Sequence, residues 1–115
     1  MRGPNYTKLF KQTISVYDQT TYKKTVYRNA FFDFRKVQNV DRTGSSEANT
    51  ALIVVPGAAQ PFRVGDKVMI GDGPVLADAR AWAEFIPAKY SGLVVIRYVD
   101  PKYYRGALVH WEAGG

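Results

Sequence analysis

One stretch, residues 62–73, constrains the fold more than any other part of this chain. Its apolar residues share one parity and its basic residues share the other: Phe62, Val64, Val68 and Ile70 against Arg63 and Lys67. Such alternation is typical of a half-buried strand. Gly65-Asp66 interrupts the strand where glycine suits a bulge or bend. Residues 71–74, Gly-Asp-Gly-Pro, predict a tight turn. Bent strands joined by tight turns are typical of small all-β barrels.

Further strands are expected on both sides of this stretch. β-Branched and aromatic residues are enriched in five other segments, which we interpret as strands: 9–17, 22–40, 51–55, 93–99 and 107–112. The second is long and predicts a bend or split near Asn29-Ala30. It has aromatic residues of both parities, so we expect both of its faces to be covered. Residues 100–106, from Asp100-Pro101 to Gly106, predict a hairpin connection.

One short helix is expected over Val75–Phe85, where the composition changes to alanine with Leu76, Arg80 and Glu84. Asp72 is the expected cap, with Pro74 near the first turn and Pro87 as the stop. Three apolar residues would dock the helix on the sheet: Trp82, Phe85 and Ile86. The alternative is another strand, because Ala81, Ala83 and Phe85 also alternate with larger residues.

Residues 41–50 contain no apolar residue except one alanine and are rich in glycine and serine. We interpret them as a mobile loop, and ten residues is long for a plain hairpin connection. The expected fold is therefore mainly β, a small β-barrel with a long polar loop and one short helix. It forms a single domain over residues 1–115, with a flexible lead-in over residues 1–8.

Composition excludes several classes of protein. A chain of 115 residues with 46% hydrophobic residues can bury a core of its own. No cysteine is present, which excludes disulfides and thiolate metal sites, and one histidine argues against a histidine-built site. No apolar run suggests a signal peptide or approaches the roughly 20 residues that span a bilayer. We expect a soluble protein, made in a cytoplasm and without a membrane partner.

No catalytic constellation is visible, so we expect no enzyme, no cofactor and no metal site. His110 has no nucleophile or second histidine to work with, and a structural role is the simpler interpretation. The spacing of Asp66, Asp72 and Asp78 does not match a calcium loop. Gly71-Asp72-Gly73 is no phosphate loop, because no Gly-Lys-Ser/Thr follows.

Net charge and aromatic residues point to a binding partner. The net charge is +6, of which residues 1–57 carry +5. Basic and aromatic residues interleave in two segments, which form a candidate contact surface: Lys23, Lys24, Tyr27 and Arg28, then Lys102, Tyr103 and Arg105. Such segments can stack bases and touch phosphates, but exposed tyrosine and arginine also suit a protein interface. Ordinary strand composition with a solvated basic surface is the third interpretation.

Four segments together resemble a family of small structural proteins from tailed phages and prophages, the minor capsid or head-closure (stopper) proteins. They are the Tyr-rich N-terminal strand pair, the Thr43-Gly44 loop leading to 52–56 (Leu-Ile-Val-Val-Pro), the 62–71 stretch, and the ending from Gly106 through 110–114 (His-Trp-Glu-Ala-Gly). The order of these segments, rather than any one of them, carries the resemblance.

The resemblance implies a non-enzymatic virion subunit, assembled in the host bacterial cytoplasm. Such proteins are β-barrels that form a homo-oligomeric ring, hexameric or dodecameric, between a portal or adaptor and the tail. The ring extends the channel and touches packaged double-stranded DNA nonspecifically. The matching loop residues would face the channel or a neighbour: Arg42, Thr43, Gly44, Ser45 and Ser46. A nucleic-acid-binding barrel and another virion protein, such as a tail-completion or capsid-decoration subunit, are the alternatives.

Overall fold

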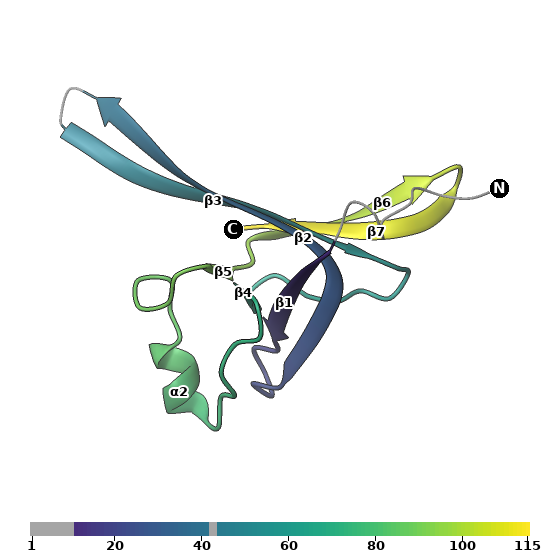
Figure 1. The fold of residues 1–115 in the computed structure, drawn as a ribbon, viewed down its shortest axis with the longest axis horizontal. Coiled ribbons are helices and arrows are strands. Elements are labelled where there is room, and N and C mark those ends of the chain that lie inside the picture. Colours follow the sequence, from purple (N-terminus) through teal and green to yellow (C-terminus); the bar gives the residue numbers. More distant parts are fainter. Residues whose placement is uncertain (1–10, 42–43) are drawn as a thin grey trace.

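The computed structural model describes residues 11–41 and 44–115, with side chains described for 11–34 and 51–115. Seven strands and one helix follow in the order β1 (Gln12–Tyr17), β2 (Lys24–Asp41), β3 (Gly44–Pro56), β4 (Lys67–Ile70), α2 (Ala79–Glu84), β5 (Leu93–Val95), β6 (Tyr98–Tyr104) and β7 (Ala107–Gly114). The strands form one antiparallel sheet in the order β5-β4-β1-β2-β3-β7-β6. The sheet curls into a half-barrel from which two ribbons project (Figure 1). The expected mainly-β, barrel-like fold with one short helix is confirmed.

The two edge strands of this sheet are neighbours in the chain. The link between β5 and β6 contacts the strand next to each edge: Ile96 N–H donates to Asp66 O, directly before β4 (2.8 Å), and Arg97 N–H donates to Gly114 O at the end of β7 (2.7 Å). One continuous segment therefore bridges the open side of the sheet and brings its ends together.

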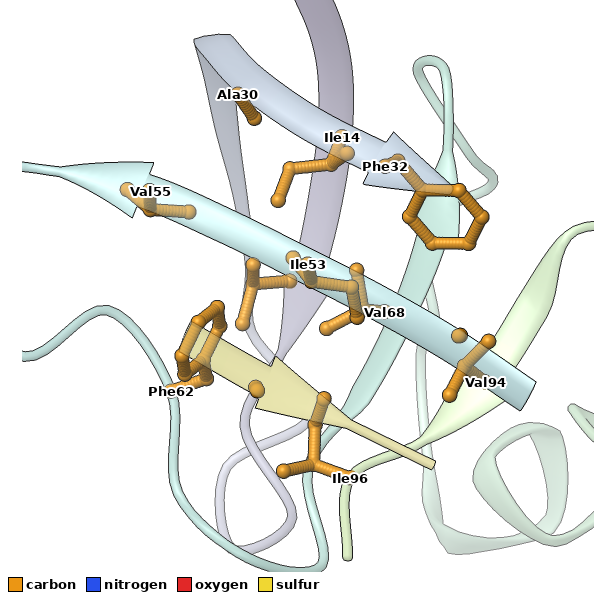
Figure 2. Packing of buried hydrophobic residues seen from close by; sticks show 12 residues of the cluster. Ile14, Ala30, Phe32, Ile53, Val55, Phe62, Val68, Val94 and Ile96 are labelled. Carbon is orange, nitrogen blue, oxygen red and sulfur yellow. The ribbon is translucent and has the colours of Figure 1, made fainter. Parts of the chain in front are cut away.

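The concave side of the sheet holds the main core. Ile14 and Val16 of β1 meet Ile53 of β3, Val68 of β4 and Phe62 (Figure 2). The core residues of one strand lie two positions apart, as Ile14 and Val16 do, but Ser15 and Tyr17 of the other parity are also buried, so both faces of β1 are covered. Burying this apolar surface is the largest favourable contribution to folding.

The opposite face of β1, β4 and β5 is covered by the segment that contains α2. Tyr17, Phe85 and Leu93 form a second buried cluster there, and the Tyr17 and Phe85 rings meet edge to face at 4.7 Å. Lys67 of β4 is buried on this face; its amino group donates to Trp82 O (2.6 Å) and lies 4.1 Å from the Trp82 ring centroid. Burial lowers the pKa of Lys67.

The central stretch contains a tight turn where a bulge or bend was expected. Asp66 N–H donates to Arg63 O (3.0 Å), and Gly65 has φ +97°, which fits the third position of a type II turn. Val64 stands at the turn and is 57% exposed, so its expected inward position is wrong. β4 is consequently limited to Lys67–Ile70, and the chain bends at Gly71 and Asp72 directly after it.

The long strand β2 changes partner near Asn29-Ala30, which confirms the expected bend. Residues 24–30 pair with β1, and residues 31–41 pair with β3. At the change, the Gln12 side chain takes the place of a strand: its Oε1 accepts from Phe32 N–H (2.8 Å) and its Nε2 donates to Phe32 O (3.2 Å).

The expected loop over residues 41–50 is wrong for the part that the structure describes. Asp41 ends β2 and residues 44–50 begin β3, paired from Asp41↔Gly44 onward. The polar composition suggested a loop, but the ladder that starts in the core at Phe31↔Val54 continues outward along these residues. The result is a long β2–β3 ribbon that extends beyond the barrel (Figure 1).

The expected connection over residues 100–106 shortens to Arg105-Gly106. Both residues have positive φ, +52° and +82°, as a two-residue type I′ hairpin turn requires. Asp100-Pro101 does not end the strand, because β6 pairs only with β7 and an edge strand tolerates proline.

The helix is shorter than expected, and its cap is Asp78 rather than Asp72. The Asp78 carboxylate accepts from Ala81 N–H (2.8 Å) at the start of α2. Trp82 and Phe85 pack in the second cluster as expected, with Phe85 fully buried, whereas Ile86 is half-buried and belongs to neither core cluster. The alternative of another strand here is wrong.

The buried phenol of Tyr17 predicts a loss of stability at high pH. Its hydroxyl donates to Pro74 O (2.6 Å), and burial raises its pKa from 10.0 to about 12. The unfolded phenol ionises near pH 10, so Tyr17 stabilises the fold below pH 10 and this contribution is lost as the pH rises toward 12. Between pH 10 and 12 we expect urea midpoints to fall further for the wild type than for Tyr17→Phe. Tyr103→Phe, on an exposed tyrosine, is the control; an equal fall in all three proteins would contradict the prediction.

Candidate interaction surface

The β6–β7 ribbon is one candidate surface, because it projects from the barrel (Figure 1) and its residues include exposed tyrosines. Tyr103 is 64% exposed, and Tyr98 and Tyr104 are also exposed. Arg105 at the turn lies 5.6 Å from the centroid of the Tyr104 ring. Exposed tyrosine and arginine are the residues that most often anchor protein interfaces.

The first basic and aromatic segment contributes less than its sequence suggested. The Lys24 amino group is held by the Asp72 carboxylate at 2.5 Å and by Gly73 O at 2.9 Å. This ammonium lowers the pKa of Asp72. Tyr27 is half-buried and packs against the main core, and its burial raises the pKa of the phenol. Lys23 and Arg28 remain exposed.

The second segment lies on the β6–β7 ribbon, away from the first. Lys102 is half-buried opposite His110, while Tyr103 and Arg105 are exposed. The start of β2 is at the other end of the barrel body (Figure 1). The seven residues therefore do not form one contact surface.

Three of the five expected channel residues fall on the β2–β3 ribbon. Gly44, Ser45 and Ser46 begin β3, opposite Asp41, Val40 and Asn39. Arg42 and Thr43 lie outside the described residues. The backbone thus places Gly44, Ser45 and Ser46 at the far end of the ribbon, which is the part of β3 most distant from the core.

A groove that sequence reasoning missed lies between the β2–β3 ribbon and the edge strand β5. Two adjoining hollows of about 210 and 430 Å³ share three residues: Phe34, Pro87 and Leu93. The first continues along Val94, Val95, Arg97 and Gly115, and the second along residues 88–92. Phe34 of β2 is 38% exposed.

The acidic residues singled out in the sequence have separate structural roles. Asp66 is buried and accepts from the Gln19 and Arg63 backbone, Asp72 pairs with Lys24, and Asp78 caps α2. His110 Nε2 lies 3.1 Å from Glu112 Oε2. Among the described residues, no three histidine or carboxylate groups gather closely enough to hold a metal ion.

Comparison with known proteins gives no relative for this chain. No family model, curated protein or solved structure matches it. Within residues 11–41 and 44–115, no helix has both the length and the apolar character needed to cross a membrane. Function is therefore inferred from the residues and the fold alone.

Proposed function

We propose that this chain is a structural subunit of a tailed-phage or prophage virion, a head-closure protein whose copies form a head-tail connector ring. The observation that carries the proposal is the pair of β-ribbons that extend from a small half-barrel. The sequence resemblance to head-closure proteins supports the virion role. The proposed partners are further copies of the chain, the portal or adaptor, the tail and the packaged DNA.

The physical argument concerns what stabilises a ribbon. An isolated two-stranded ribbon is marginally stable in water, and additional strands or a packed face are needed to stabilise it. The outer residues of β2 and β3 pair only with each other, from Arg35↔Thr50 to Asp41↔Gly44. A neighbouring subunit that packs on the ribbon supplies the missing contacts, so both ribbons suit an assembled ring better than a lone monomer.

The ribbons suggest a division of roles within the ring. The far end of β2–β3, with Gly44, Ser45 and Ser46, is small and polar, as a segment that reaches a channel or a neighbour requires. The β6–β7 ribbon carries tyrosines and Arg105, which suit a contact between subunits. Since the basic segments lie apart, a nucleic-acid-binding module explains the arrangement less well.

Light scattering with size-exclusion chromatography over a wide concentration range tests the proposal. We expect species of six or twelve 12.9 kDa subunits to form with rising concentration. Tyr103→Ser should weaken this association about tenfold, as loss of an interface anchor does. Val75→Ser, which changes an exposed apolar residue near α2, should leave it unchanged.

A DNA titration at two salt concentrations accompanies that measurement. A connector ring contacts the phosphate backbone of DNA rather than its bases, so we expect weak binding without sequence preference. A strict monomer that binds DNA or RNA tightly, with affinity that falls steeply with salt and on replacing Lys23 and Arg28, would overturn the proposal in favour of the nucleic-acid module.

A further inference from the structure

The groove beside β5 presents a strand edge that no described strand covers, although Gly115 lies against the Val95 carbonyl. Gly92 O accepts from Ile70 N–H, and Ile96 N–H donates to Asp66 O, so the backbone groups of both residues face β4. Because strand residues alternate, Val94 also faces β4, whereas Leu93 and Val95 direct their backbone groups away from it. Among the described strands, none pairs with that side of β5.

β5 is a very short edge strand, which is one common protection, but it lacks the proline and the charged residues that protect the other edge. The other edge strand, β6, carries Pro101 and the charged residues Asp100 and Lys102, which discourage strand addition. β5 consists of Leu-Val-Val and lies beside the exposed Phe34 ring. An extended segment in the groove would therefore find backbone donors and acceptors on one side and apolar surface beneath it.

The charge around the groove selects the occupant. Lys89 lines one end and Arg97 lines the other. Both are exposed, and neither forms an ion pair with any described residue. A complementary segment carries carboxylates that reach these two cations. A second copy is the poorer match, because the chain itself carries +6.

We propose that the groove binds one extended, acidic segment of a different protein, which adds a strand to β5. Apolar residues at alternate positions contact Phe34, Pro87 and Val95, and acidic residues near its ends pair with Lys89 and Arg97. The identity of this partner rests on the proposed function: the segment belongs to an adjoining component of the head-tail assembly. The ribbons join copies of the chain, and the groove joins the ring to its neighbour.

A peptide titration on the full chain tests the assignment. The probe is a synthetic ten-residue peptide of alternating valine and threonine with two glutamates at each end; the same peptide with lysines at the ends is the control. We expect the acidic peptide alone to bind and to protect the Leu93 and Val95 amides from hydrogen exchange. The double variant Lys89→Ala, Arg97→Ala should weaken binding at least about tenfold.

Two controls separate the groove from general electrostatics. Lys23→Ala, Arg28→Ala removes the same charge from exposed residues outside the groove and should leave the affinity within about twofold. A peptide N-methylated at alternate residues cannot complete a strand ladder and should not bind. Equal weakening by both double variants, or unchanged exchange at Leu93 and Val95, would overturn the proposal.

Light scattering on the same proteins distinguishes this proposal from the subunit role. If the Lys89, Arg97 variant loses self-association, the groove holds a second copy and the assignment to a different protein is overturned. If no peptide binds while rings form normally, the groove proposal fails and the proposed function stands. If the peptide binds but no ring forms, the groove proposal stands and the proposed function fails.

Discussion

Replacing Asp66 with alanine should cost about 3 kcal/mol of the free energy of unfolding, because its buried carboxylate accepts hydrogen bonds from two separate chain segments. Its Oδ1 accepts from Gln19 N–H and from the Gln19 side-chain amide, each at 3.1 Å, and its Oδ2 accepts from Arg63 N–H at 2.8 Å. Asp66 is only 3% exposed. Alanine would leave these donors partly buried without an acceptor.

The geometry predicts more than a local change. Arg63 and Asp66 are the ends of the type II turn, and Asp66 O also accepts from Ile96 N–H, which lies in the segment that bridges the two edges of the sheet. Loosening the turn should therefore affect both the β1–β2 connection and the closing segment. We expect faster hydrogen exchange at Gln19, Arg63 and Ile96 together.

Urea unfolding followed by tryptophan fluorescence measures the cost. Asp66→Asn is the graded variant, because its oxygen can still accept from Gln19 while its NH₂ group faces Arg63 N–H; it should fall between alanine and the wild type. Asp100→Ala removes a carboxylate from an exposed position and should change stability by less than about 0.5 kcal/mol. Equal midpoints for Asp66→Ala and Asp100→Ala would show that the carboxylate is not structural.

The sequence predicted the strands that alternate cleanly and missed what depends on distant partners. Ile14 and Val16, or Val68 and Ile70, alternate because a core lies on one side of a pleated strand, and this rule is local. Val64 obeyed the same parity in the sequence, but the hydrogen bond between Asp66 and Arg63 closes a turn there and directs Val64 outward. A turn of this kind is visible only once both of its ends are placed.

Composition was a poorer guide to strand length than pairing. Residues 44–50 contain few strand-favouring residues, yet they continue a ladder that begins in the core. Asp100-Pro101 suggested a turn, but β6 is an edge strand, and an edge strand tolerates proline because its missing N–H would only have faced solvent. Lys67 shows the same limit. The alternation correctly placed Lys67 and Val68 on opposite faces of β4, but it did not show that Trp82, fifteen residues further along the chain, covers the face of Lys67.

The sequence predicted only part of the candidate surfaces, because it identifies residue types but does not show which of them have partners in the fold. Tyr103 and Arg105 stood out as an aromatic and basic pair, and the structure leaves both exposed on one ribbon. Lys24 stood out equally, but Asp72 holds its amino group. The groove had no sequence signal of its own, because it arises where β5 and β2 approach each other across the half-barrel.

Replacing Phe85 with alanine should have the largest effect of any single change, about 3–5 kcal/mol, which is typical for a buried phenylalanine. Its ring is fully buried between two tyrosines, with centroids 4.7 Å from Tyr17 and 4.8 Å from Tyr90. α2 itself has no fully buried residue, so Phe85 at its C-cap is the main apolar attachment of the helix. Most of the lost energy should therefore come from detachment of residues 75–92.

Hydrogen exchange separates detachment from global unfolding. If Phe85 anchors this segment, amides of residues 79–92 exchange faster in Phe85→Ala, whereas those of β1 and β2 keep their protection. Phe85→Leu retains much of the volume and should lose less than half as much stability. Since Pro87 and Tyr90 line the groove, the alanine variant should also lose peptide binding. Uniform loss of protection would instead place the helix segment within the cooperative core of the half-barrel.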